Sequence, residues 1–352
     1  MSTSARIPVA ILGGSGYVAG ELIRLVSGHP RFTLAAVASS SQVGESVVAA
    51  FPHLAGTAAD GLAFSASLTP LLARGTPLGV FAATPHGATA NLIDELLTAA
   101  HGDDLRVVDL SADFRFADAA AYQAIYGAHP APTRLGEFVC AVPEHLHGKP
   151  ARHVTQPGCF TTAVVLAAYP FLAEALVGDD IFVSAITGSA GSGRKLSPGT
   201  HHPERRSNLF AYKPLGHRHE AEMRLLLAAA RGGRAPTVDF VPHSGPMVRG
   251  IHATLRMELH KETPASELVA RVNRSYAHTP FVHATLEPPK LTEVVGTNRC
   301  RLGIAVRGKR LVVTSVIDNL VKGAAGGAVQ WMNRLYDLPD ETGLTLAGLG
   351  WY

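Results

Sequence analysis

The hydrophobic residues in the first half of the chain form short runs separated by helical patterns. The runs have the length of buried strands, and they lie at 6–12, 32–39, 77–84 and 105–111. Residues 17–27 and 88–100 instead place apolar side chains along one side of a helix. Alternating strands and helices of this kind are typical of a parallel, doubly wound sheet. We therefore expect an α/β domain here.

The pattern changes in the second half. Strands are expected at 181–187, 237–244 and 251–259, and a hairpin that turns at Gly308-Lys309 is expected over 299–318. Residues 251–259 alternate between apolar and polar side chains, as in a half-exposed antiparallel strand. Helical patterns occur at 265–277 and 322–336. These features predict an antiparallel sheet with helices, and a boundary between the halves near residues 150–160.

The composition narrows the class of protein. The 352 residues are 47% hydrophobic and 17% charged, with a net charge of +3. Basic residues are scattered, so nucleic acid is not expected as a partner, and no segment is long and apolar enough to cross a membrane. Neither a signal peptide nor a disulfide framework is indicated, and the three cysteines are widely spaced. We expect a cytoplasmic protein without a metal.

A glycine-rich loop follows the first expected strand. The segment "ILGGSGYVAGEL" holds Gly14-x-Gly16-x-x-Ala19, which fits the dinucleotide fingerprint in its alanine form. Such glycines allow a tight turn and let a pyrophosphate approach the N-terminus of the next helix. The alternative is a glycine turn that binds nothing.

The end of the second strand favours NADP over NAD. NAD-binding proteins usually carry an acidic residue there, but no Asp or Glu lies between Glu21 and Glu45. Three serines, Ser39, Ser40 and Ser41, could donate hydrogen bonds to a 2′-phosphate. No arginine stands in this loop to compensate the phosphate charge.

Cys159 lies in "TQPGCFTTA", after a Pro-Gly turn and before an apolar helix. A cysteine at a helix start meets free N–H groups and a partial positive charge, which favour the thiolate. The alternative is a small buried residue of the core. Cys140 and Cys300 are expected to be core residues.

A second cluster gives Cys159 a potential proton partner. The segment "GHRHEAEM" carries His217, His219 and Glu222, and a spacing of three puts His219 and Glu222 on one helix face. A carboxylate there can orient an imidazole for acid–base work. The alternatives are a solvated helix start or, for the two histidines, a metal site that no other residues complete.

Eight segments in order then resemble one family over nearly the whole chain. They are "GGSGYVAGEL", "ATPHG", "VDLSADFR", "AVPE", "QPGCFTTA", "GHRHEAEM", "VRGI" and "IDNLVKGAAGGAVQWMN". Together they resemble the N-acetyl-gamma-glutamyl-phosphate reductase family, which is similar in architecture to aspartate-semialdehyde dehydrogenase and glyceraldehyde-3-phosphate dehydrogenase. The resemblance implies an NADP-binding Rossmann domain over 1–158 that takes back the C-terminal helix, 322–352. It also implies an α+β catalytic and oligomerisation domain over 159–321.

The resemblance also implies roles for single residues. Cys159 matches the nucleophile and His219 the acid/base. The matches to the NADP(H) site are Gly13, Ser15, Gly16, Tyr17, Val18, Ser39, Ser40, Ser41, Pro85 and Asn319.

The expected reaction is NADPH-dependent reduction of N-acetyl-gamma-glutamyl phosphate to the 5-semialdehyde through a Cys159 thioester, in arginine biosynthesis. Gln156 and the Cys159 N–H are candidates for the oxyanion site. The anionic groups of the substrate need cations or N–H donors. The candidates are Arg115, Ser189, Arg194, His217 and Arg249.

Three alternatives remain open. The segment 197–219 is more like a sister group that reduces an aminoadipyl or glutamyl phosphate carried on a small acidic amino-group carrier protein. Aspartate-semialdehyde dehydrogenase performs the same chemistry on a shorter acyl phosphate. A non-catalytic NADP-sensing protein would need neither Cys159 nor His219. A homo-oligomer, either a dimer or a tetramer, is expected.

Overall fold

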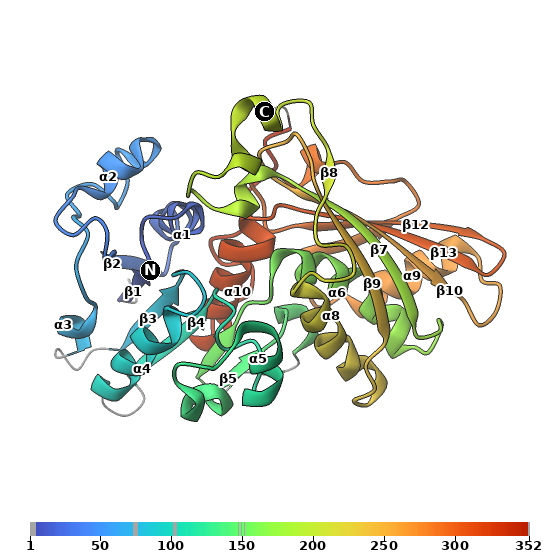
Figure 1. Ribbon diagram of the computed structural model, residues 1–352, viewed down its shortest axis with the longest axis horizontal. Coiled ribbons are helices and arrows are strands. Elements are labelled where there is room, and N and C mark those ends of the chain that lie inside the picture. Colours follow the sequence, from blue (N-terminus) through green and yellow to red (C-terminus); the bar gives the residue numbers. More distant parts are fainter. Residues whose placement is uncertain are drawn as a thin grey trace. The chain divides into compact units, whose positions relative to one another are not determined.

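The computed structural model describes residues 5–72, 77–100, 104–146, 148, 150 and 152–350, and they form two compact units (Figure 1). Described residues up to Pro157, with Ala324–Thr345, make the first unit. Gly158–Gly323 and the described residues from Leu346 onward make the second. The expected return of 322–352 to the first domain therefore differs at its end, where the Leu349 N–H donates to Val295 O at 3.4 Å within the second unit. Residues 1–4 and 351–352 of the expected ranges lie outside the described residues.

The first unit contains a six-stranded parallel sheet in the order β2-β1-β3-β4-β6-β5. Its strands are β1 (Ile7–Leu12), β2 (Phe32–Ala38), β3 (Leu78–Ala82), β4 (Leu105–Asp109), β5 (Phe138–Cys140) and β6 (His153–Thr155). Its helices are α1 (Tyr17–Ser27), α2 (Val47–Ala50), α3 (Thr69–Leu72), α4 (Thr89–Ala99), α5 (Ala119–Tyr126) and α10 (Gly326–Leu335). Short 3₁₀ turns lie at Pro52–Leu54, Pro132–Glu137 and Pro143–His145.

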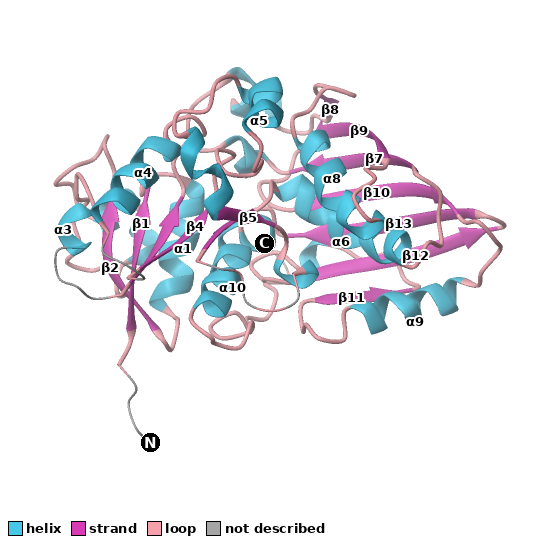
Figure 2. Ribbon diagram, turned by 90° about the horizontal axis from the view of Figure 1, so that it is seen from below, coloured by secondary structure: helices cyan, strands magenta, loops and turns pink. Residues whose placement is uncertain are grey.

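Helices cover both faces of this sheet, because its central strands are buried on both sides. α1 and α4 lie on opposite faces (Figure 2). α10 joins this unit from the far end of the chain and packs against β4 and α1. The Trp331 indole on α10 donates to Ala141 O at 3.1 Å, which fixes the helix to the loop after β5.

The second unit contains a seven-stranded sheet in the order β11-β12-β13-β10-β7-β9-β8. Its strands are β7 (Asp180–Thr187), β8 (Phe210–Ala211), β9 (Thr237–Ser244), β10 (Ile251–Glu258), β11 (Val282–Thr285), β12 (Cys300–Arg307) and β13 (Arg310–Ile317). Its helices are α6 (Cys159–Ala173), α7 (His202–Arg205), α8 (His219–Ala228) and α9 (Ala265–Ser275). Short turns lie at Ser189–Ser192, Pro198–Thr200, Ala229–Arg231 and Leu291–Glu293, and a π-helical turn, Val321–Ala325, leads into α10.

This second sheet is mixed: it contains the expected antiparallel pairs and also two parallel pairs that were not expected. β7 pairs with β9 in parallel, and so does β11 with β12. Alternation of apolar and polar residues does not report strand direction, and the β7–β9 connection contains α8, which allows a parallel crossover.

One face of the second sheet is covered by α6, α8 and α9 (Figure 2). Along β7 and β10, buried residues alternate with exposed or half-buried ones, so the opposite face carries the partly exposed side chains. Phe182 on β7 is an exposed large hydrophobic residue on that face.

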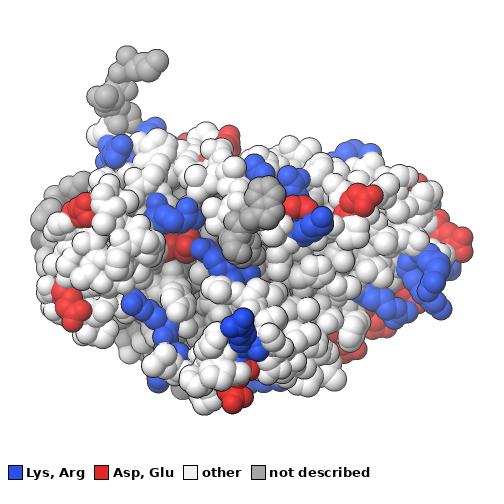
Figure 3. Space-filling view, turned by 90° about the horizontal axis from the view of Figure 1, so that it is seen from above, with Lys and Arg blue, Asp and Glu red and all other residues white. Residues whose placement is uncertain are grey.

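Charged groups of both signs are dispersed over the face of the molecule that Figure 3 shows, without a continuous basic band. No helix in the described part of the chain is long and apolar enough to span a membrane. Within those same residues, no group of three or more His, Cys, Asp or Glu side chains is arranged to hold a metal.

Candidate active site

Cys159 is the first residue of α6 and is half-buried. The preceding Gly158 is extended and provides no side-chain cap, so the first N–H groups of the helix lie beside the thiol. The partial positive charge of the helix end stabilises a thiolate at this place. The predicted presentation of Cys159 at a helix start is therefore present.

His219 begins α8, and its imidazole lies against the backbone of Gly158. A Cβ added to Gly158 would overlap the imidazole, with Nε2 as the nearest atom. Gly323, in the π-helical turn, approaches from another side, where an added Cβ would lie 2.7 Å from Cys159 Cβ. Two glycines thus clear space around the thiol, one for the imidazole and one for the backbone of the turn.

Glu222 supports the turn that carries the cysteine. Its carboxylate oxygen Oε2 accepts from the Gly158 N–H at 3.0 Å and from the Thr161 hydroxyl at 3.0 Å. The side chain is buried. The expected task of Glu222 was to orient His219, and these bonds add a second task, fixing α8 to the start of α6.

His217 holds the start of α8 from the other side. Its Nδ1 accepts the His219 N–H at 3.1 Å, and burial lowers the pKa of His217 to about 4. The neutral ring therefore carries its proton on Nε2. Its ring lies 4.6 Å from the His219 ring and 5.6 Å from that of Tyr212.

The candidate substrate loop packs against a neighbouring loop of the same unit. The N–H of Ser189 donates to Met247 O at 3.0 Å, and Gly188 leaves no room for a Cβ beside Val248 O. Arg249 forms an ion pair with the buried Asp318, with Nε and Oδ2 3.2 Å apart. Arg194 is exposed.

Asn319 is also placed in this region. Its Oδ1 accepts the Gly250 N–H at 2.7 Å, while its buried Nδ2 has no hydrogen-bond partner among the described residues. Nδ2 faces Gly191, where an added Cβ would lie 3.7 Å away. A donor left in this state fits an acceptor from a bound molecule.

Gln156 and Arg115 belong to the first unit. The Gln156 N–H donates to Asp109 O at 2.8 Å, and its side-chain amide lies flat against Gly327 of α10. Arg115 is buried and donates to Leu110 O at 3.2 Å. The structure brings Cys159, His217, His219 and Glu222 together within the second unit.

The glycine loop has the geometry of a dinucleotide site, and the glycine that makes the tight turn stands just before the fingerprint. Gly13 has a φ of +88° and lies against Thr84, so it makes the tight turn. Gly16, at the start of α1, has open space where its Cβ would be. Gly20 packs closely on Phe51. Gly14 lies closely against Val37 of β2, so no Cβ fits there either. The tight turn falls on Gly13, just before the fingerprint Gly14-x-Gly16-x-x-Ala19, and the close packing falls on Gly14 and Gly20.

The rest of the candidate cofactor residues surround the ends of β2 and β3. The hydroxyls of Ser39 and Ser41 lie 3.3 Å apart after β2, and Ser40 is exposed. Tyr17 is exposed, Ser15 and Val18 are half-buried, and Pro85 is exposed beyond β3. α1 has no acidic residue in its first turn. These residues fit a phosphorylated dinucleotide, since nothing at the two phosphate positions repels an anion.

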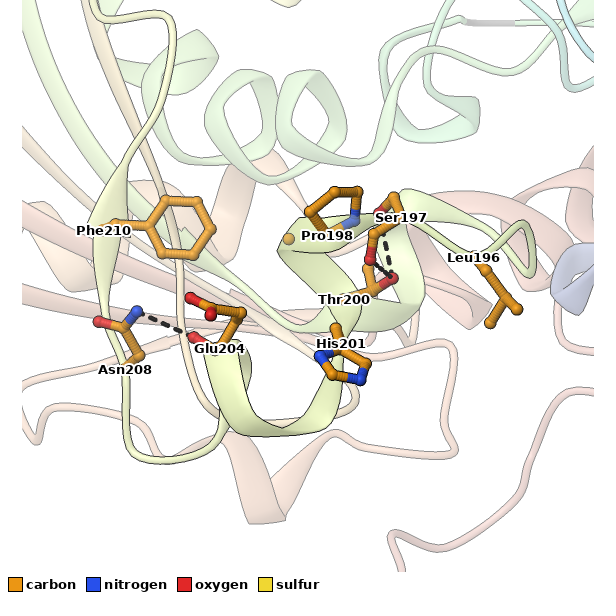
Figure 4. Close-up of a pocket in the computed structure, with 9 residues that line it drawn as sticks. Leu196, Ser197, Pro198, Thr200, His201, Glu204, Asn208 and Phe210 are labelled. Carbon is orange, nitrogen blue, oxygen red and sulfur yellow. Dashed lines mark hydrogen bonds between the residues drawn. The ribbon is translucent and has the colours of Figure 1, made fainter.

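A cavity of about 800 Å³ lies on the surface of the second unit (Figure 4). Its lining comes from one stretch of chain, between Leu196 and Phe210. Leu196, Pro198 and Phe210 give it apolar walls, and His201 and Glu204 add polar groups. None of the candidate site residues predicted from the sequence lines this cavity, although most of the lining lies in the segment 197–219 that resembles the sister group.

Sequence reasoning also missed Gly158, Gly323 and Tyr212. The only signal for Gly158 was its place before Cys159, and Gly323 stood inside a segment that predicted a regular helix. Tyr212 stood in a polar segment with no periodicity.

Comparison with known proteins agrees with the two units. Residues 8–145 match the family described as "Semialdehyde dehydrogenase, NAD binding domain", and residues 159–319 match "Semialdehyde dehydrogenase, dimerisation domain". In fold, the chain is similar to aspartate semialdehyde dehydrogenase II from Vibrio cholerae, with a TM-score of 0.70 and 15% identity over 95% of this chain and 99% of that one. It is also similar to the Candida albicans aspartate semialdehyde dehydrogenase with NADP, with a TM-score of 0.65 and 17% identity over 94% and 99%.

Curated relatives are closer in sequence. The N-acetyl-gamma-glutamyl-phosphate reductase of Acidithiobacillus ferrooxidans is 39% identical over 96% of this chain and 98% of its own length. Those of Azotobacter vinelandii and Halorhodospira halophila are 40% and 41% identical, over 97% and 96% of this chain and 99% and 98% of their own lengths. With this identity over almost its full length, the chain belongs to the N-acetyl-gamma-glutamyl-phosphate reductase family.

Proposed function

We propose that this protein reduces N-acetyl-gamma-glutamyl phosphate to N-acetylglutamate 5-semialdehyde, with NADPH as the reductant and release of phosphate, in arginine biosynthesis. The observation that carries the proposal is Cys159 at the start of α6, with the His219 imidazole packed against the residue before it. A nucleophile beside an imidazole at a helix start is the arrangement that acyl transfer needs.

The thiolate of Cys159 attacks the acyl carbon, the bond to the phosphate oxygen breaks, and a thioester remains on Sγ. Bound NADPH supplies the hydride that reduces this thioester. The resulting thiohemiacetal on Cys159 loses the C–S bond, which releases the semialdehyde and restores the thiol group. Negative charge on the carbonyl oxygen during these steps is stabilised by the N–H of Cys159, and we include Gln156 as a second donor.

We assign proton transfer to His219. Its ring lies within reach of the residue before the nucleophile, and it can protonate the oxygen of the thiohemiacetal and take that proton back as the C–S bond breaks. His217 keeps the His219 backbone in place through its Nδ1 and stays neutral near pH 7, because burial lowers its pKa to about 4. Glu222 holds the two helices in register.

The cofactor site of the proposal is the loop from Gly13 to Val18. The N-terminus of α1 would hold the pyrophosphate, and Ser39, Ser40 and Ser41 would hold the 2′-phosphate. Pro85 would line the site, and Asn319 would offer its free Nδ2 to the nicotinamide. For the anionic groups of the substrate we retain Arg115, Ser189, Arg194, His217 and Arg249, of which Arg249 already neutralises Asp318.

The open face of the second sheet supports a homo-oligomer. Phe182 and the neighbouring half-buried residues of β7 and β10 form a surface that a second copy would cover. We also propose a cytoplasmic location, in keeping with only three, widely spaced cysteines.

A carrier-linked substrate is the second candidate. The cavity between Leu196 and Phe210 lies in the segment that resembles the sister group, and its apolar walls suit a group larger than an acetyl amide. In this version the same chemistry acts on a glutamyl or aminoadipyl phosphate attached to a small acidic carrier protein.

The test is the reverse reaction with N-acetylglutamate 5-semialdehyde, NADP and phosphate. Cys159→Ser should lower kcat by more than about a thousandfold, because the hydroxyl is hardly ionised at neutral pH. Cys140→Ser, in the first unit, is the matched control and should keep activity. Turnover of Cys159→Ser at the wild-type rate would refute the thioester route, and activity with a carrier-linked substrate alone would select the second candidate.

A further inference from the structure

Arg205 carries a buried guanidinium group that has no role in the proposed reaction as described above. It ends the single helical turn α7, and only 7% of the residue is exposed. Its neighbours Glu204 and Arg206 are exposed. Arginine is almost never buried to this extent without a charged partner.

All the hydrogen-bond partners of Arg205 in the described chain are neutral. Nη1 donates to the Ser244 hydroxyl, and Nη2 donates to the carbonyls of Gly245 and Met247. Nε has no partner, and no carboxylate forms an ion pair with this side chain among the described residues. Burial without a counter-charge lowers the pKa of Arg205, and such a charge costs several kcal/mol unless an anion joins it.

The position of this uncompensated charge links it to the nucleophile. Burial is the main reason why the pKa of the Tyr212 phenol is raised; a charge on Cys159 acts in the same direction, and Arg218 and Arg205 act in the opposite one. The Tyr212 ring in turn lies 5.6 Å from His217, whose Nδ1 binds the His219 N–H. Tyr212 therefore links Arg205 to the site of Cys159 only indirectly, within the second unit.

A shared carbonyl links Arg205 to the candidate substrate loop as well. Met247 O accepts from Arg205 Nη2 at 3.5 Å and from the Ser189 N–H at 3.0 Å. Arg249, on the neighbouring loop, is already paired with Asp318. Arg205 is thus a positive charge beside the Ser189 loop that no protein carboxylate neutralises.

We propose that Arg205 binds an anionic group of the substrate, either the phosphate or the carboxylate of the acyl phosphate. The inference rests on the proposed function and names one of its specificity residues. Nη1 and Nη2 already donate to neutral partners, so the Nε–H is the donor that remains for an oxygen of such a group. Nε is itself buried, so this contact requires a displacement of α7, a single turn whose other residues are exposed.

The experiment compares Arg205→Gln with Arg206→Gln in the reverse reaction, with N-acetylglutamate 5-semialdehyde, NADP and inorganic phosphate varied in turn. Loss of a charge-assisted hydrogen bond should raise one KM by roughly 10-fold to 100-fold, with a smaller effect on kcat. A higher KM for phosphate identifies the phosphate as the anion, and a higher KM for the semialdehyde identifies the carboxylate. Arg206→Gln should leave both constants within about twofold of wild type, as for an exposed charge.

Unchanged KM values in Arg205→Gln would overturn the inference while leaving the proposed function intact, because wild-type turnover is measured in the same assay. A Gln variant that melts far below wild type is replaced by Arg205→Lys, compared with Arg206→Lys. The ammonium keeps the charge but loses the Nε–H, so one KM should still rise severalfold. A purely structural Arg205 would give a lower melting temperature with wild-type KM values in the Lys variant, which would also overturn it.

Discussion

At the scale of single residues, the space around Cys159 depends on two glycines. Gly158 and Gly323 have no Cβ, and each lies where a methyl group would meet the imidazole of His219 or the Cβ of Cys159. Gly158 has an ordinary extended conformation, so sterics and not backbone dihedrals require glycine there. The relative position of thiol and imidazole therefore depends on a residue with no functional group.

Gly158→Ala tests this dependence. The added methyl group would overlap the imidazole and displace His219, and a shift of about 1 Å at a reacting group lowers kcat by roughly 100-fold. The affinity for NADPH should not change, since the glycine loop between β1 and α1 is distant in the sequence and belongs to the first unit. The measurement is kcat together with NADPH binding by fluorescence titration.

Gly178→Ala is the matched control for that substitution. Gly178 lies in the same unit, its backbone is not left-handed, and nothing lies within 4 Å of its added Cβ. It should keep wild-type kcat. A Gly158→Ala enzyme that is as fast as wild type would mean that His219 does not need its present position.

At the scale of elements, the strands with a regular hydrophobic pattern could be predicted from the sequence. A helix whose regular geometry is interrupted could not. The apolar runs predicted β1, β2, β3 and β4 within two residues, because buried parallel strands need nothing but apolar residues of the right length. Residues 322–336 predicted one helix, yet Val321–Ala325 is a π-helical turn, since the close approach of Gly323 to Cys159 is a tertiary constraint.

The residues of the candidate site likewise include some that the sequence could predict and one that it could not. One short motif carries Cys159, and a second one carries His217, His219 and Glu222. The residue types in these two motifs predicted that they act together. Arg205 stands in "HHPERRSN", which reads as a solvated polar segment, and its burial depends on Ser244 and Gly245 about forty residues away. No local pattern carries that information.

The start of α4 makes an element-scale prediction. Asp113 is fully buried and accepts from the Gly87 N–H at 2.6 Å and the Ala90 N–H at 3.0 Å, so it caps α4 and fixes the loop that holds Pro85. Asp113→Asn should destabilise the first unit by about 1–3 kcal/mol, because one buried N–H loses its acceptor. The affinity for NADPH should fall as well, since Pro85 is a candidate cofactor contact.

The measurements are the melting temperature and the dissociation constant for NADPH. Asp118→Asn is the control, because Asp118 caps α5 through the Ala121 N–H at 2.8 Å at an exposed site, where an amide oxygen substitutes at little cost. Equal melting temperatures for the two variants would contradict the capping role of Asp113.

At the scale of the whole molecule, both units contain histidines that must stay neutral. Burial lowers the pKa values of His29, His153 and His217 to about 4. In each of the three, Nδ1 accepts backbone N–H groups, from Phe32, Val107 and His219 respectively. Protonation would place a hydrogen on Nδ1 facing another hydrogen, so the fold excludes the charged form.

These histidines predict a loss of stability in mild acid. Their pKa is near 6.5 in the unfolded chain, so stability is complete above that pH and falls as the pH drops toward 4, by roughly 2 kcal/mol at most per histidine at pH 5. Asp109 acts in the opposite sense, because burial raises its pKa to about 6 and its neutral form favours the fold as the pH falls from 6 toward 4. Burial also lowers the pKa of His252, which adds to the histidines, and raises the pKa of Glu220, which adds to Asp109. Four groups outweigh two, and the melting temperature should be nearly constant from pH 7 to 8 and decline below 6.5. His29→Asn, which keeps an acceptor but cannot titrate in this range, should melt lower at pH 8 and lose less between pH 8 and pH 5 than wild type. Calorimetric scans of the full chain at both values measure the difference, and an equal loss in the variant would show that His29 does not carry the effect.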